Sequence, residues 1–185
     1  HHLINYFYQK ARENPELHFR IYLKKNWQTL FPQRLPNWQY QIFGPQKAWT
    51  QFALPLRLYL EKLTHKAPDI FFTLGHYAPR FSPIPTVISI MDLAFLNFPE
   101  EFLKKDLQKL SRWTSYSAQK AQHIFTISQA SKADIIKAYK IKPEKITVTY
   151  LGVDLEKPKL DSDRSFQLIA RHLGIKKPYL IYLGT

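Results

Sequence analysis

The chain of 185 residues contains no cysteine. This absence excludes disulfide bonds, thiolate metal sites and a cysteine nucleophile, and it fits a reducing compartment. No apolar run approaches the ~20 residues that a membrane-spanning helix needs, and the first residues lack the charged-then-apolar pattern of a signal peptide. Metal-ligand spacing, a G-x-S-x-G elbow and a G-x-G-x-x-G turn are also missing. The sequence therefore argues against metal, serine-hydrolase and dinucleotide sites.

Acidic residues are few compared with basic ones. The chain has 14 Asp and Glu against 27 Lys and Arg, which gives a formal net charge of +13. Such a balance favours anionic partners, namely nucleic acid, anionic lipid head groups or phosphorylated substrates. The lysines are scattered, and no aromatic-glycine RNA motif or helix-turn-helix signal is present. We therefore expect no nucleic-acid partner and favour simple solubility or an anionic membrane surface.

Apolar runs of strand length alternate with segments of helical period along the chain. The hydrophobic content of 45% is sufficient for a core. Strands are predicted at residues 17–23, 38–43, 69–74, 86–90, 123–127, 145–150 and 178–183. Helices are predicted at residues 3–12, 48–63, 99–121, 129–138 and 164–173, the last ended by Gly174. This alternation predicts an α/β fold with a Rossmann-like parallel sheet and flanking helices.

The predicted helix at residues 48–63 allows two placements. It carries Trp49 and several leucines together with Lys47, Arg57 and Lys62. Such a helix can lie on a membrane surface, but a core helix packed on a sheet has the same pattern, and we favour the core. Pro55 within the pattern predicts a kink or a late start of the helix.

One central stretch supplies a candidate functional carboxylate. Residues 86–90 are rich in β-branched side chains and follow Pro85, as expected of a buried parallel strand. Asp92 comes just after this strand. In open α/β sheets, ligands bind beyond the carboxyl ends of strands, at a switch in strand order. Asp92 is therefore either a functional carboxylate or a brace for the loop that follows.

Two further side chains follow neighbouring predicted strands. His76 comes after residues 69–74, and Ser128 comes after residues 123–127. Parallel strands bring their carboxyl ends to one edge, so His76, Asp92 and Ser128 are predicted to line one crevice. Ser128 begins a helix and either favours an anion or serves only as the N-cap. His76 is either a ligand-binding group or an ordinary loop residue.

Several segments together resemble family 4 glycosyltransferases. Residues 124–136 show the strand ending in serine followed by Ser-Lys and an acidic residue, and residues 143–154 end in Leu-Gly-Val-Asp, as in that family's signature. Residues 85–100 are similar to the family's P-x-V-x-T-I-H-D-L segment with its later Pro-Glu. Residues 69–77 match the strand and loop that precede it, and residues 177–185 look like the first strand of the family's second domain.

The resemblance implies a GT-B fold, in which two Rossmann-like domains flank a cleft. Residues 1–153 would form the acceptor-side domain without its first strand, 154–177 the linker with a short helix, and 178–185 the first strand of a truncated donor-binding domain. The implied reaction transfers a sugar from a nucleotide-sugar to a glycan or lipid-linked acceptor, with retention and with no metal or cofactor. The implied location is cytoplasmic, at the inner face of the membrane, and this chain alone is expected to be inactive. The alternative is a non-catalytic basic α/β module that binds an anionic glycan or membrane.

The resemblance also assigns site residues. Asp92 and Met91 take the positions of the family's catalytic Asp and His, and a thioether cannot replace imidazole as a hydrogen-bonding group. Either Asp92, His76 or a backbone group takes over that role, or the activity is weakened. The implied substrate-binding residues are His76, Tyr77, Ser128, Gly184 and Thr185.

Overall fold

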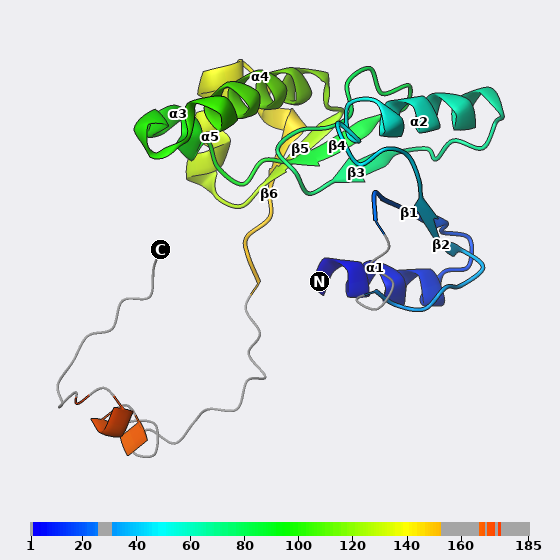
Figure 1. Cartoon of the computed structure of the whole chain (residues 1–185), viewed down its shortest axis with the longest axis horizontal. Coiled ribbons are helices and arrows are strands. Elements are labelled where there is room, and N and C mark those ends of the chain that lie inside the picture. Colours follow the sequence, from blue (N-terminus) through cyan, green and yellow to red (C-terminus); the bar gives the residue numbers. More distant parts are fainter. Residues whose placement is uncertain (1, 26–30, 153–166, 169, 173, 175–185) are drawn as a thin grey trace. The chain divides into compact units, whose positions relative to one another are not determined.

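The computed structural model describes residues 2–25, 31–152, 167–168, 170–172 and 174, and Figure 1 shows the chain as a cartoon. The chain divides into two compact units, His1–Tyr150 and Leu151–Thr185. In the second unit, residues 167–168 and 170–172 are helical. Gly174 follows with φ of +65°, and its N–H donates to the carbonyl of Ala170 at 3.0 Å. Gly174 therefore ends the helix as predicted.

The first unit contains two parallel sheets with helices between and beside their strands. The elements in chain order are α1 (His2–Glu13), β1 (Phe19–Leu23), β2 (Trp38–Ile42), α2 (Ala53–Leu63), β3 (Phe71–Thr73), β4 (Thr86–Ser89), α3 (Ala94–Asn97), η2 (Pro99–Glu101), α4 (Lys104–Lys120), β5 (His123–Thr126), α5 (Gln129–Tyr139), η3 (Pro143–Lys145) and β6 (Ile146–Val148). One sheet pairs β1 with β2, and the other has the order β3-β4-β5-β6. Every pairing between these strands is parallel, so the predicted Rossmann-like α/β fold is confirmed.

Strand order in the larger sheet follows the order of the chain (Figure 1). The order β3-β4-β5-β6 contains no reversal of strand order beside Asp92. β4 lies between β3 and β5, and all four of its residues are buried. Its β-branched side chains suit a strand that is covered on both faces.

The larger sheet carries the main core. Ile88 of β4 and Ile124 of β5 lie opposite each other and are fully buried, together with Ala118 of α4 and Ile135 of α5. The complete cluster is Ala78, Ile88, Ile90, Leu93, Phe95, Ala118, Ala121, Ile124, Ile135, Tyr139, Ile141 and Ile146. A second cluster, formed by Ala11, Trp38 and Tyr40, joins α1 to β2. The helices α4 and α5 are therefore fixed on the sheet whose strand ends carry the predicted site.

The single helix predicted from Pro99 to Ala121 is wrong at its start. Residues 99–101 form the short helix η2, Leu103 is extended with φ of −61° and ψ of 133°, and α4 begins only at Lys104. The interruption brings Phe102 against the core, where its ring lies 6.5 Å from that of Phe95. The tertiary contact of Phe102 therefore overrides the local helical pattern.

The helix α2 begins at Ala53, the late start that Pro55 predicts. Gly44 allows its close approach, because a Cβ on Gly44 would lie 2.6 Å from the Cβ of Ala53. The favoured core placement is correct for one side of the helix only. Leu54 and Leu58 are buried, whereas the opposite side exposes large apolar side chains, which are Phe52, Leu56, Tyr59, Leu60 and Leu63.

Candidate functional site

The predicted site residues follow strands that end at one edge of the larger sheet. β3, β4 and β5 are parallel neighbours, so their carboxyl ends lie at the same edge. His76 follows β3, Asp92 follows β4, and Ser128 follows β5. This is the edge at which open α/β sheets bind ligands.

His76 is half-buried in the loop that follows β3. Its Nδ1 atom is buried and has no hydrogen-bond partner among the described residues. Burial lowers the pKa of His76, and the negative charge of Asp92 opposes this shift. The lowered pKa favours the neutral imidazole at pH 7. A neutral imidazole has one nitrogen that donates and one that accepts, so it suits the recognition of a hydroxyl group.

Asp92 has the bracing contact that the sequence left as one of two alternatives. Its Oδ1 atom accepts a hydrogen bond from the N–H of Ala94 at 2.9 Å, where α3 begins. The side chain is exposed, and its Oδ2 atom accepts no hydrogen bond from the described residues. One oxygen therefore holds the loop, and the other remains open to a ligand or solvent.

Met91 is attached to the neighbouring strand through its backbone. Thr126, which is buried at the end of β5, donates its hydroxyl to the carbonyl of Met91 at 3.5 Å. The side chain of Met91 is half-buried. The contact fixes the backbone at this position next to Asp92, but a thioether offers no proton to a substrate.

Ser128 is the N-cap of α5. Its Oγ atom accepts from the N–H of Ser131 and donates to the Ser131 hydroxyl, both at 3.0 Å. Among the described residues, no hydrogen bond joins Ser128 to His76 or Asp92. The capping alternative is thus confirmed, and substrate binding by Ser128 stays a prediction.

Tyr77 belongs to an aromatic and cationic cluster that the sequence analysis missed. Its ring makes an edge contact with Trp113 of α4, with 5.1 Å between the centroids. The Nζ atom of Lys109 lies 5.5 Å from the Tyr77 centroid and 4.9 Å from that of Trp113. The spacing of four between Lys109 and Trp113 puts both on one face of a helix and was the available signal. Such a cluster offers both an apolar surface and a positive charge to a ligand.

The loop that carries His76 and Tyr77 is attached at both ends. The N–H of Gly75 donates to the Thr73 hydroxyl at 3.2 Å, and the N–H of Ala78 donates to Ser117 of α4 at 3.0 Å. The second contact is buried. The strand end and α4 together therefore position the loop.

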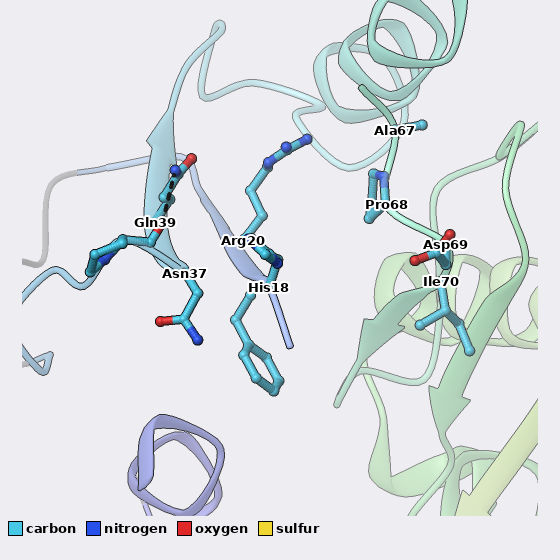
Figure 2. A pocket seen from close by; sticks show the side chains of 10 residues that line it. His18, Arg20, Asn37, Gln39, Ala67, Pro68, Asp69 and Ile70 are labelled. Carbon is cyan, nitrogen blue, oxygen red and sulfur yellow. Dashed lines mark hydrogen bonds between the residues drawn. The ribbon is translucent and has the colours of Figure 1, made fainter. Parts of the chain in front are cut away.

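A cavity of about 390 Å³ lies at the other ends of the strands (Figure 2). Its lining consists of His18, Phe19, Arg20, Pro36, Asn37, Gln39, Ala67, Pro68, Asp69 and Ile70. Figure 2 shows Arg20 and Asn37 on one side and the segment 67–70 on the other. Arg20 already donates to Glu61 and to the carbonyl of Lys66, each at 2.8 Å. Because this cavity adjoins the amino ends of β1 and β3, it is separate from the site at the carboxyl ends.

A smaller cavity of about 270 Å³ is lined by residues of α3 and α5, among them Asn97 and Asp134. Neither cavity is lined by a predicted site residue.

Within the described ranges, no group of three or more His, Asp or Glu is arranged to hold a metal ion, and none of the helices described there has the length and apolarity to span a bilayer. The described residues do not include Gly184, Thr185 or any other part of the predicted segment 178–185. Of the predicted segment 154–177, they include only 167–168, 170–172 and 174.

Comparison with known proteins gives one family. The family model described as Glycosyltransferase Family 4 matches residues 11–157, which include β1 to β6 and the predicted site residues except Gly184 and Thr185. A search of curated proteins found no match.

Proposed function

Because this chain belongs to glycosyltransferase family 4, we propose that it is the acceptor-side part of a retaining, nucleotide-sugar-dependent glycosyltransferase. The glycosyltransferase family itself implies a sugar donor and an acceptor. The nucleotide-sugar donor, the glycan or lipid-linked acceptor and retention at the anomeric carbon are our proposal. The observation that carries it is the placement of His76 and Asp92 after the neighbouring parallel strands β3 and β4, inside the matched segment.

The proposed reaction forms and breaks one bond at the anomeric carbon. The acceptor hydroxyl oxygen bonds to this carbon, the bond to the nucleotide diphosphate breaks, and the hydroxyl proton leaves with the departing phosphate. No metal or cofactor is required in this proposal. Within this chain, the task is to hold the acceptor hydroxyl in a reactive position.

We assign this positioning to His76. The family's histidine position is occupied by Met91, which cannot donate a hydrogen bond. His76 is neutral, and its buried Nδ1 has no partner among the described residues. Pairing with the acceptor hydroxyl would remove the cost of leaving this nitrogen unsatisfied, and it requires the hydroxyl to reach an atom that is closed to solvent in the free protein. Asp92 orients the loop through Ala94. The Tyr77–Trp113–Lys109 cluster provides a surface for the rest of the acceptor.

For the domain organisation we propose residues 1–153 as the acceptor-side domain, 154–177 as the linker and 178–185 as the first strand of the donor-binding domain. Gly184 and Thr185 would then contact the donor. The cavity of Figure 2 supports the idea that the acceptor-side sheet takes one more strand. β1 and β3 are edge strands, and the Tyr22 and Phe71 rings lie 6.3 Å apart. A strand between them would join the two sheets.

We further propose a cytoplasmic location at the inner face of a membrane. The net charge of +13 supports it, because anionic lipids attract basic surfaces. An acceptor with a lipid diphosphate would be concentrated there. The charge alone also fits a basic binding module without catalysis, so the decisive measurement is sugar transfer.

The test uses the complete gene product with a panel of labelled nucleotide-sugars and lipid-linked or glycan acceptors. We expect transfer that is unchanged by a metal chelator, and an early product with the donor's anomeric configuration by NMR. His76→Gln should reduce kcat/KM about 10²-fold, whereas His123→Gln, on the same sheet but at the opposite strand end, should leave it unchanged. Absence of transfer with every donor, together with binding of anionic glycan, would support the non-catalytic module instead.

A second variant tests the position of Met91. Met91→His restores a donor at the family's histidine position, so transfer should increase if that role was lost. An unchanged rate would mean that His76 already fulfils it. A large increase in transfer by Met91→His in the wild-type background would contradict the assignment to His76.

A further inference from the structure

We propose that the outer side of α2 docks on an anionic lipid membrane. The surface, here called the outer stripe, consists of Phe52, Leu56, Tyr59, Leu60 and Leu63. These residues are 72%, 61%, 44%, 51% and 76% exposed, in that order. Large apolar side chains that form one continuous exposed row mark an interaction surface rather than chance exposure.

The spacing of the outer stripe places it opposite the packed side of the helix. Leu54, Leu58 and Glu61 are buried, and they lie half a turn away from Leu56 and Leu63. A helix that is apolar on both sides is normally covered on both sides. In the described part of this unit, only one side of α2 is covered.

The helix is held firmly with the outer stripe facing outward. Glu61 accepts from Arg57 at 2.6 Å and from Arg20 at 2.8 Å. Lys62 donates to the carbonyl of Pro83 at 2.6 Å. At the start of the helix, Gly44 lets Ala53 approach closely. Turning the outer stripe inward would break these contacts, so local repacking does not cover it.

The charged residues around the outer stripe favour an anionic membrane as its partner. Lys47, Lys62, His65 and Lys66 are exposed on and beside the helix. Its single acid, Glu61, is buried and paired with arginines. An apolar stripe edged by cations is the pattern of helices that lie in the interface of an anionic membrane. Tyrosine also suits this interface, because its ring is apolar and its hydroxyl remains hydrated.

A second copy of the chain fits this surface less well. A symmetric dimer through α2 would bring the same patch of each copy together, and Lys62 and Lys66 of both copies would then lie close to one another. The membrane occupant fits the proposed location. Its test contains no measurement of sugar transfer, so its failure leaves the transferase proposal standing.

The test measures sedimentation of the 185-residue chain with vesicles of neutral phosphatidylcholine, with and without phosphatidylglycerol. We expect strong binding only to the anionic vesicles. The triple variant Leu56→Ser, Leu60→Ser, Leu63→Ser should lower the partition coefficient by about a hundredfold or more. The matched control is Leu103→Ser, because Leu103 is 75% exposed but lies just before α4. It should bind as the wild type does.

The lack of cysteine permits a second, spectroscopic test. An environment-sensitive fluorophore attached to Leu60→Cys should shift to the blue on anionic vesicles, and one on Leu103→Cys should not. The circular dichroism spectra and the unfolding temperatures of all variants are compared first, so that loss of fold is recognised.

Four results would overturn the proposal. The first is absence of wild-type binding to anionic vesicles, and the second is equal binding to neutral ones. The third is equal loss in the stripe and control variants. The fourth is a wild-type dimer that the triple variant converts to a monomer, which would identify a second copy as the occupant.

Discussion

The Tyr22 hydroxyl donates to the Glu61 carboxylate at 2.5 Å, which connects β1 to the last turn of α2. Arg20 and Arg57 donate to the same carboxylate. Glu61 is only 6% exposed, whereas the two arginines are 27% and 38% exposed. One buried carboxylate therefore joins residues from β1 and α2 that lie about forty positions apart in the sequence.

Removing this carboxylate should destabilise the first unit. Glu61→Ala leaves the Tyr22 hydroxyl and two guanidinium groups without their shared acceptor, and we expect a loss of about 2 kcal/mol in the free energy of unfolding. The solvent contact of both arginines keeps the loss below that of a fully buried pair. Chemical denaturation checks it, with Glu13→Ala as the control. The Glu13 pair with Lys10 is exposed and screened by solvent, so its loss should have little effect on the free energy of unfolding. Equal losses would contradict the structural role of Glu61.

Alkaline pH should destabilise the fold through Tyr22. Burial, with the bond to Glu61 adding to it, raises the pKa of Tyr22 to about 12. The folded state thus keeps the proton that the unfolded chain loses near pH 10. This contribution to stability is complete below pH 10 and disappears as the pH rises toward 12. Burial also raises the pKa of Tyr139 to about 12.

The check is the free energy of unfolding as a function of pH for Tyr22→Phe and Tyr139→Phe. Each variant should remove part of the alkaline loss. At pH 7, Tyr22→Phe loses a hydrogen bond and should cost about 1 kcal/mol. Tyr139→Phe deletes a buried hydroxyl that has no partner among the described residues, so it should be neutral or stabilising. An alkaline profile identical to that of the wild type in both variants would contradict the assignment.

Acidic pH should destabilise the fold through His76. Burial lowers the pKa of His76 and Asp92 raises it. The folded state favours the neutral ring. The contribution of this preference to the free energy of unfolding is therefore complete above pH 6.5 and is lost as the pH falls through the lowered pKa. Asp92→Asn removes the opposing charge and should lower the pKa of His76 further. NMR titration of the His76 ring checks this, with the resonance assigned from His76→Gln. An unchanged or raised pKa would show that the two side chains do not interact.

Loss of the Ser128 cap should weaken α5. Ser128→Ala leaves the N–H of Ser131 without its acceptor, and we expect a cost of about 1 kcal/mol. Ser128→Asp keeps an acceptor and should retain most of the stability. Thermal unfolding compares the two. If Ser128 also binds an anionic substrate group, Ser128→Asp should keep the fold and reduce substrate affinity, because it adds a negative charge.

Several elements follow directly from the local sequence. The β-branched run after Pro85 forms the central buried strand, because such side chains suit a sheet covered on both faces. Ser128 begins α5, and Pro55 delays the start of α2. These residues act on their own backbone or on neighbours within one turn. The family motifs are local as well, which is why residues 69–154 already indicated the family that matches residues 11–157.

Other features depend on contacts between residues of different elements, which a local sequence pattern does not reveal. The break before α4 exists because Phe102 packs against the core near Phe95. Lys109 and Trp113 meet Tyr77 only because the loop after β3 is fixed to α4. In the same way, the sequence placed His76 and Asp92 after neighbouring strands, and the tertiary structure decided that burial keeps the histidine neutral.

The helix α2 shows most clearly what the local sequence determines and what depends on tertiary contacts. Its sequence determined an apolar, cationic helix that fitted either a core, which we favoured, or a membrane surface, because composition and period do not record which side is covered. The tertiary structure decided this by burying Glu61 among partners from β1 and α2, which fixes one side inward and leaves Phe52, Leu56 and Leu63 exposed on the other. A buried charge needs partners in defined directions, and these come from residues distant in the sequence.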